Sequence, residues 1–340
     1  MRGFVLALLS AALFGAATPA GKILLTDFSP FQLAGLLYLG AAVGVAPGVL
    51  REGRVSRGLD RTNRLRLAGA VFFGGVVAPV LLLFALRFMQ AGSVSLLLNL
   101  EMAATAVLGV ALFGEHLGKR GWLGVAGVVA AGAVLSGRGG EPGLRAGLLV
   151  TGACLCWGFD NNLTALIDGI SPVRTTWWKG VIAGTTNLVV ALCVASTSWP
   201  ASRVVIAVAV GAVCYGASIA LYVTAAHDAG ATRTQAVFAA APFIGAVLSC
   251  LVLAETPERS WLFGVAVLVP SVALLIFDRH EHFHVHEAVA HVHSHRHDDG
   301  HHVHTHPGQP ASTRHAHWHE HERIGHRHAH GSDLHHRHGR

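Results

Sequence analysis

Histidine occupies alternate positions near the end of this chain, in the stretch RHEHFHVHEAVAHVHSHRHDDGHH at residues 279–302. Alternate side chains of an extended segment point the same way, so neighbouring imidazoles can converge on one ion. Neutral imidazole suits Zn, Ni, Co and Cu. The pattern lacks the paired spacing of a structural zinc site and predicts many overlapping, exchangeable metal sites. The candidate ligands are His280, His282, His284, His286, His291, His293, His295, His297, His301, His302, His304 and His306.

A second chemical signal is a carboxylate inside an apolar run, Glu101 in LLLNLEMAAT. A charged side chain at the centre of a bilayer costs about 2.5–3.5 kcal/mol on insertion scales, so it needs a reason. On a helix Thr105 shares the face of Glu101, whereas Asn99 points about 200° away. Glu101 either binds a proton or a cationic substrate and couples its movement, or it only stabilises packing between spans.

A third group of polar residues lies in the run CWGFDNN, which contains Asp160, Asn161 and Asn162. Lys179 lies at a similar depth in the next apolar run, so an ion pair between Asp160 and Lys179 is expected. The pair is either a structural clamp that cancels two charges inside the membrane or part of a binding site for a substrate carboxylate or amine.

Two prolines inside apolar runs, Pro19 and Pro242, either open the backbone so that it can hold a polar substrate or are tolerated kinks. The sequence has no phosphate-binding loop of the GK[ST] type and no catalytic constellation. We therefore expect neither ATP hydrolysis nor an enzyme, and no cofactor is required beyond the divalent metal of the tail.

The elements that position these residues are membrane helices. Of 340 residues, 52% are apolar and 13% are charged, against about 25% charged in soluble proteins. About 20 apolar residues cross a bilayer core, and ten such runs are present. The predicted spans are 3–24, 31–50, 66–86, 92–113, 121–137, 145–167, 174–196, 203–224, 233–253 and 260–277. The tail has few apolar residues and no helical stripe, which predicts disorder.

Lys and Arg are more frequent on one side of these spans, mainly because of the loop REGRVSRGLDRTNRLR at residues 51–66. The positive-inside rule then places both termini in the cytoplasm, in a cell (inner) membrane. The first span also resembles a secretory signal, but the helices that follow favour an uncleaved span. Glycines spaced four apart allow close helix packing and a homodimer. The pI of 9.4 does not indicate nucleic acid, because the tail is nearly balanced in charge at neutral pH.

The chain also repeats itself, with the second half following the order of the first. FSPF at 28–31 corresponds to ISPV at 170–173, and LFGEHLGKRGWLGVAG at 112–127 to VLAETPERSWLFGVAV at 252–267. Five spans per copy is an odd number, so the second copy enters the bilayer inverted. The expected domains are repeat 1 at 1–137, repeat 2 at 146–278 and the His-rich cytoplasmic tail at 279–340.

The span order, the SP that opens each second span and the GE and AE that close the fourth and ninth spans resemble the EamA family of the drug/metabolite transporter superfamily. CWGFDNNLT together with the His-rich end resembles a subgroup of it. The resemblance implies alternating-access transport of small metabolites, amino acids or drugs. We therefore expect a transporter of a small organic molecule whose tail binds metal.

Two alternatives remain: a transporter of a divalent metal or metal chelate, and a membrane-tethered metal buffer or sensor. The spans contain few metal ligands, and Lys179 would repel a cation, which favours the organic substrate. The expected partners are the lipid bilayer, the substrate and divalent metal ions.

Overall fold

The computed structural model describes residues 2–52, 59–137, 140–194, 198–257 and 259–277, and four strands between residues 280 and 330. The helical body and the strand-forming tail are separate compact units, and each is described by itself.

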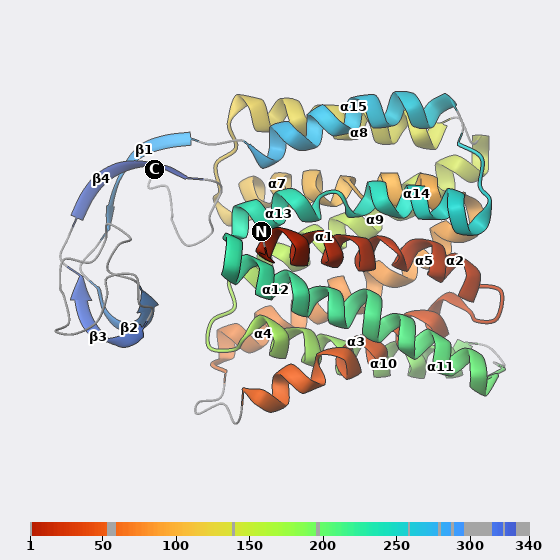
Figure 1. Ribbon diagram of the computed structural model, residues 1–340, viewed down its shortest axis with the longest axis horizontal. Coiled ribbons are helices and arrows are strands. Elements are labelled where there is room, and N and C mark those ends of the chain that lie inside the picture. The colour runs from red at the N-terminus through yellow and green to blue at the C-terminus, as the bar shows by residue number, and fades with distance from the viewer. Residues whose placement is uncertain are drawn as a thin grey trace. The chain divides into compact units, whose positions relative to one another are not determined.

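The first half of the body is helical throughout (Figure 1). Its elements are α1 (Arg2–Gly15), α2 (Ala17–Leu24), α3 (Pro30–Arg51), α4 (Arg61–Ala70), the π-helix η1 (Val71–Val77), α5 (Ala78–Phe88), α6 (Ala91–Leu97), α7 (Leu100–Phe113) and α8 (Lys119–Gly137). The SP pattern has a local role at the start of α3. The Ser29 hydroxyl accepts from the backbone N–H of Gln32 and the Gln32 side chain accepts from the N–H of Ser29, with Pro30 in the first turn, which is a capping box.

The second half repeats most of this order. It comprises α9 (Gly140–Ala165), α10 (Pro172–Val194), α11 (Ala201–Val210), the π-helix η2 (Gly211–Ala217), α12 (Ser218–Ala229), α13 (Ala231–Phe238), α14 (Ala241–Leu253) and α15 (Arg259–Ile276). The two π-helices occupy the same place in their halves, each inside the third span, and the short helices α6 and α13 both open the fourth span. These irregularities recur in the two halves, although the first half opens with two helices, α1 and α2, and the second with the single helix α9.

Nine helices in the described part of the chain are long and apolar enough to cross a membrane. They match nine of the ten runs predicted from the sequence. The helix α9, which corresponds to the run at 145–167, is not among them, although its 26 residues exceed the length that a crossing needs. Asp160, Asn161 and Asn162 lower its hydropathy. The chain is thus a multi-pass, all-helical membrane protein in its body.

Several predicted spans differ from the structure in continuity and in length. The first, fourth and ninth are each two helices, interrupted at Ala16, at Leu98–Asn99 and at Ala239–Ala240. The third is longer than predicted and begins at Arg61 rather than at residue 66, because Asp60 caps α4 by accepting from the N–H of Asn63. Apolar runs reveal length, but they do not reveal such breaks.

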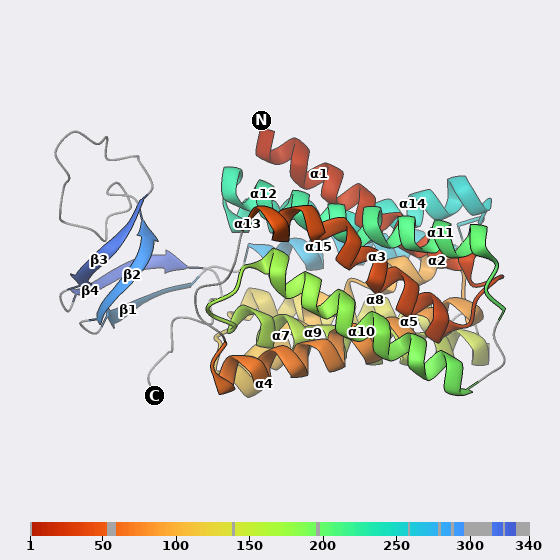
Figure 2. The same cartoon turned by 90° about the horizontal axis from the view of Figure 1, so that it is seen from below.

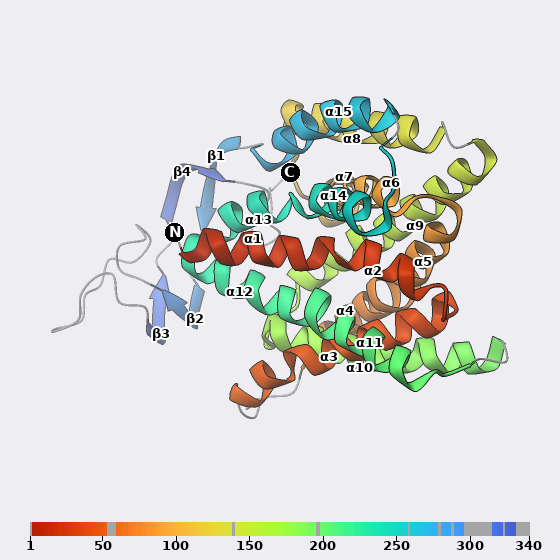
Figure 3. The same ribbon diagram turned by 45° about the vertical axis from the view of Figure 1, so that its right-hand side comes forward.

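The two halves pack into each other rather than side by side. The first helix of each half contacts the third and fourth spans of the other: α1 lies against α12 and α14, and α9 lies against α5 and α7. Figure 2 shows α1 with α12 on one side of the bundle and α9 with α5 on the other. The last helices, α8 and α15, run side by side along one edge (Figure 3).

Glycine permits the close approach of α3 to α11 and η2. A Cβ on Gly40 would lie 2.3 Å from the carbonyl oxygen of Val208, and one on Gly211 would lie 2.2 Å from that of Leu37. Small residues let helix backbones approach where the membrane offers no hydrophobic driving force between helices. These contacts hold the two halves together around the centre of α3.

The tail forms four strands, β1 (His280–His286), β2 (Val289–His295), β3 (His315–His321) and β4 (Ile324–His330), with β1 paired to β4 and β2 to β3, both antiparallel. The disorder expected for the tail as a whole stays a prediction; the four described segments are strands. A period of two between histidine and other residues is also the period of a strand. The register places histidine opposite histidine, for example His282 with His328 and His293 with His317.

Candidate functional site

A cavity of about 180 Å³ lies where the two halves meet. Its walls come from α1, α3, α7, α9, α10, η2 and α12, so both halves contribute. The lining residues are Phe14, Tyr38, Ala41, Glu101, Trp157, Asp160, Asn161, Thr176, Lys179, Gly180, Tyr215 and Ile219. The sequence analysis singled out Glu101, Asp160, Asn161 and Lys179 from three separate runs, and all four line this cavity.

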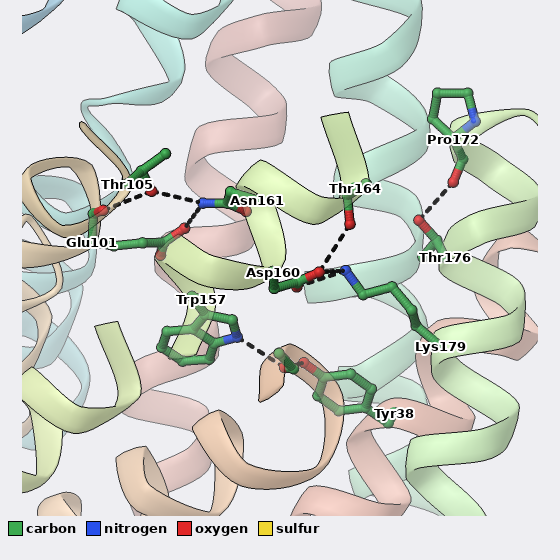
Figure 4. Close-up of polar contacts among 11 residues, drawn as sticks. Tyr38, Glu101, Thr105, Trp157, Asp160, Asn161, Thr164, Pro172, Thr176 and Lys179 are labelled. Atoms are coloured by element: carbon green, nitrogen blue, oxygen red, sulfur yellow. Dashed lines mark hydrogen bonds and ion pairs between the residues drawn. The ribbon is translucent and has the colours of Figure 1, made fainter. Parts of the chain in front are cut away.

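Glu101 enters the cavity from the first turn of α7, directly after the break that separates α6 from α7. The backbone N–H of Glu101 bonds to the carbonyl of Leu98 at 3.0 Å and that of Met102 to the carbonyl of Asn99 at 3.2 Å, so the backbone stays hydrogen-bonded across the break. The Asn161 amide nitrogen donates to Oε1 of Glu101 at 2.9 Å and to Oγ1 of Thr105 at 3.2 Å (Figure 4). Thr105 shares the face of Glu101, as the sequence predicted.

The expected ion pair between Asp160 and Lys179 is present. Lys179 Nζ donates to both carboxylate oxygens of Asp160 at 2.6 Å, and the Thr164 hydroxyl donates to Oδ1 at 2.9 Å (Figure 4). The exposed fractions of the Asp160 and Lys179 side chains are 6% and 18%. Two charges of opposite sign are therefore placed together in one wall of the cavity.

The π-helix η1 organises the aromatic part of the wall. The carbonyl oxygen of Gly74 accepts from Tyr38 Oη at 2.6 Å and from Trp157 Nε1 at 3.0 Å, and both rings are drawn in Figure 4. A Cβ on Gly74 would lie 1.9 Å from an Asp160 oxygen, so a glycine is needed there. Such π-type segments are frequent at functional sites.

The other residues proposed from the sequence lie outside the cavity lining. Asn99 is buried and donates to the carbonyl of Leu96, which agrees with the expectation that it cannot face the same cavity as Glu101. Asn162 is buried and joins α9 to the carbonyl of Thr105 on α7 at 3.0 Å.

The two prolines also lie outside the lining. Pro19 is in the first turn of α2, which follows the interruption at Ala16, and Pro242 is in the first turn of α14. The Pro242 carbonyl accepts from the Ser95 hydroxyl at 2.9 Å. In this structure both prolines mark helix breaks, and the Pro242 carbonyl is bonded within the protein.

Polar contacts also tie together the region where α5 ends and α6 begins. Glu255, from the AE pattern, accepts from the backbone N–H of Ala91 at 2.7 Å and of Gly92 at 2.9 Å. Lys22 donates to the carbonyls of Leu86 and Met89. These bonds connect α2 and the α14–α15 connection to the ends of α5 and α6, and they fasten this part of the bundle.

Among the residues that the structure describes side chain by side chain, no group of three or more His, Cys, Asp or Glu is arranged to hold a metal. His280, His282, His284, His286, His291, His293 and His295 lie on the strands β1 and β2. The remaining candidates, His297, His301, His302, His304 and His306, lie outside the described residues.

Sequence reasoning missed Phe14, Tyr215 and Gly74 as parts of this site. Phe14 and Tyr215 pack with ring centroids 5.7 Å apart across the two halves, and Tyr38 is 6.3 Å from Tyr215. The doubled glycine in VFFGGVV was a signal for close approach that was available for Gly74. Nothing in the local sequence indicated the two aromatic residues.

The fold is that of a multi-helix membrane protein, and the comparisons with known proteins identify its class as a membrane transporter. Residues 1–137 and 144–277 match the EamA-like transporter family. The chain belongs to this family, which matches it twice, once in each half.

Two individual proteins are also similar. A protein of Methanothermobacter thermautotrophicus described as an uncharacterized transporter is 23% identical over 273 residues, which cover 74% of this chain and 80% of that protein. A solved structure described only as a crystal structure of a protein superposes with a TM-score of 0.57 at 18% identity, covering 80% of this chain and 94% of the other. That likeness concerns the fold alone.

Proposed function

We propose that this protein is a secondary active transporter that moves a small organic metabolite or drug across the membrane by alternating access. The observation that carries the proposal is Glu101, a carboxylate held in a cavity that both halves of the chain line. A cavity at the junction of two repeats is where secondary transporters bind their substrate. An ionisable residue inside a membrane is by default a functional candidate.

The proposal includes α9 as a tenth span. With α9 crossing the membrane, each half has five spans, and the second half is inverted relative to the first. The recurrence of the π-helix in the third span of each half and the reciprocal packing of α1 and α9 support this arrangement. Two inverted halves can exchange conformations and so expose one central site to each side in turn.

The contacts of the cavity suggest which conformation the structure represents. Asn161 and Thr176 lie near the helix ends that meet at the α9–α10 connection. Glu255 and Lys22 fasten the region around the α5–α6 connection, which lies at the opposite ends of these spans. We infer a cavity that extends toward the α9–α10 side and is closed on the other. With both termini in the cytoplasm, as the distribution of Lys and Arg favours, the open side is cytoplasmic.

We further propose that the tail binds Zn, Ni, Co or Cu in the cytoplasm and that this binding is accessory to transport. A divalent-metal or metal-chelate transporter is the second candidate, and a tethered metal buffer or sensor is the third. Against a metal substrate, the cavity offers one carboxylate besides the Asp160–Lys179 pair, whereas divalent ions take several ligands.

Counterflow in proteoliposomes tests the proposed function. Vesicles containing the purified full chain are loaded with a mixture of small organic cations, zwitterions, neutral compounds and anions, and exchange against isotope-labelled external mixture is followed by mass spectrometry. We expect at least one compound to exchange with the wild type and with Glu141→Gln, a matched control on the exposed start of α9, and not with Glu101→Gln. Vesicles that exchange nothing above protein-free controls would contradict the proposal.

Cellular metal content separates the metal-transporter candidate from the other two, which the counterflow assay distinguishes from each other. Zn, Ni, Co and Cu are measured by mass spectrometry in cells that express the full chain, the chain ending at Arg279, or Glu101→Gln. We expect the metal content to depend on the tail and not on Glu101. A content that follows Glu101 even without the tail would identify a metal transporter instead.

A further inference from the structure

The charges that line the cavity do not balance. The lining contains two carboxylates, Glu101 and Asp160, and in the described part of the chain one cationic side chain, Lys179. Lys179 Nζ lies 2.6 Å from both oxygens of Asp160, so this pair is complete in itself. The carboxylate of Glu101 is left without a cationic partner among the described residues, and the ionised cavity carries one net negative charge.

Among the described residues, only one of the two carboxylate oxygens of Glu101 has a hydrogen-bond donor. Oε1 accepts from Asn161, whose amide nitrogen also bonds to Thr105. No donor among the described residues reaches Oε2 of Glu101, although a carboxylate can accept several hydrogen bonds. An ionised group inside a membrane that lacks a partner is costly, so Glu101 must be neutralised by something that enters the cavity.

The rest of the wall offers aromatic rings and few polar groups. Tyr38 and Trp157 use their only N–H or O–H donor on the Gly74 carbonyl, so what they present to an occupant is mainly ring. Phe14 from the first half and Tyr215 from the second half extend this aromatic wall. Aromatic rings attract ammonium groups through their negative faces.

The volume of the cavity and the number of possible metal ligands in it limit the class of substrate further. The cavity volume of about 180 Å³ is smaller than the roughly 300–1,000 Å³ of pockets for drug-sized ligands. One available carboxylate and no group of three metal ligands among the described side chains disfavour a divalent ion. A small monovalent cation with an apolar surface would neutralise the charge of Glu101 and pack against the aromatic rings.

We propose that the cavity binds a small organic cation, a protonated amine or a quaternary ammonium compound, with Glu101 as its counter-ion and Tyr38, Trp157 and Tyr215 as its aromatic wall. A proton on Glu101 neutralises the same carboxylate, so proton and cation exclude each other. One proton is exchanged for one monovalent cation, and charge is conserved in each turnover. This inference rests on the proposed transport function and specifies its substrate class.

Calorimetric titration of the purified full chain tests the inference with three probes of similar shape: tetramethylammonium, tert-butanol and trimethylacetate. At pH 8 we expect tetramethylammonium to bind at least tenfold more tightly than the other two. Its binding should weaken as the pH is lowered to 5, because the proton then occupies Glu101. Tetramethylammonium that binds no better than tert-butanol, or that binds equally at both pH values, would overturn the inference.

Three variants test whether Glu101 is the residue that binds tetramethylammonium. Glu101→Gln should lose at least tenfold in affinity for tetramethylammonium, Glu101→Asp should keep most of it because the charge remains, and Glu141→Gln should bind like the wild type. Folding is checked by size-exclusion chromatography and circular dichroism. Unchanged affinity in a folded Glu101→Gln would refute the assignment. If Glu101→Gln does not fold, the affinity of Glu101→Asp for tetramethylammonium is the test. A folded Glu101→Asp that no longer binds tetramethylammonium would refute the proposal that the carboxylate acts through its charge alone.

The counterflow mixture separates failure of this inference from failure of the transport proposal. Exchange of a neutral or anionic compound together with no binding of tetramethylammonium would leave a transporter with a different substrate class. Absence of exchange for every compound would refute transport itself. We expect the exchanged compounds to be cations.

Discussion

Replacing Asp160 by asparagine isolates the Lys179 ammonium in the membrane part of the protein. At a separation of 2.6 Å and an effective dielectric constant of about 20, the gross attraction within the pair is about 6 kcal/mol. The desolvation of two largely buried charges offsets part of this attraction, and removing one partner of such a pair typically costs about 3–5 kcal/mol. We therefore expect Asp160→Asn to destabilise the body by about that amount.

A double-mutant cycle measures the interaction free energy between Asp160 and Lys179. The four proteins are the wild type, Asp160→Asn, Lys179→Gln and the double variant, and the observable is the apparent melting temperature in detergent. A loss of about 3–5 kcal/mol corresponds to a fall of roughly 5–9 °C for a helical body of this size, at about 2.1 cal/mol/K of unfolding entropy per residue. The double variant, in which no charge is left unpaired, should recover most of the stability, with a coupling energy of about 3 kcal/mol.

The Arg145–Glu141 pair is the matched control, because its side chains are 61% and 75% exposed. Breaking such a surface pair should change the stability by less than about 0.5 kcal/mol. If Asp160→Asn melts at the same temperature as the wild type, or if the double variant is no more stable than the two single variants, then the pair does not act as a clamp. The reasoning about unpaired charge in this wall would then be wrong.

Three further predictions concern other contacts. Gly74→Ala should lower the melting temperature about as much as loss of the ion pair, because the added methyl overlaps an Asp160 oxygen, whereas Gly137→Ala, which meets nothing within 4 Å, should leave it unchanged. Glu255→Gln should cost about 1.5–3 kcal/mol, since charged hydrogen bonds to two backbone amides at the start of α6 are weakened; an unchanged melting temperature would contradict the fastening role. The chain ending at Arg279 should keep the circular dichroism of the body and lose the Zn or Ni that the full chain retains on dialysis, and equal retention would show that the tail is not the metal-binding part.

Much of the body could be predicted from the sequence, because span length and internal repetition are encoded in apolar runs and in recurring patterns. The Asp160–Lys179 pair could be predicted as well, since the topology placed both residues at similar depth. The common face of Glu101 and Thr105 follows from helical periodicity alone. These predictions use only periodicity, recurring patterns and the depth at which a residue lies in its span.

Contacts between the halves could not be predicted in this way. Phe14 and Tyr215 meet only because α1 packs against the second half. The π-helices add a residue to a turn without any break in hydropathy, so neither was visible in the sequence. In the tail the alternation of histidine with other residues is itself the period of a strand. The low apolar content of the tail favoured disorder instead, so the pairing of β1 with β4 and of β2 with β3 was not expected.

Alternating access at the central cavity can be tested most directly at Ala41, which lines the cavity at the middle of α3. Ala41→Cys is placed in a chain whose five native cysteines are replaced by alanine, and a membrane-impermeant thiol reagent is applied to right-side-out and to inside-out vesicles. The account predicts modification from both sides, with the two rates shifting in opposite directions when tetramethylammonium is added. Modification from one side only, unaffected by the cation, would contradict the account.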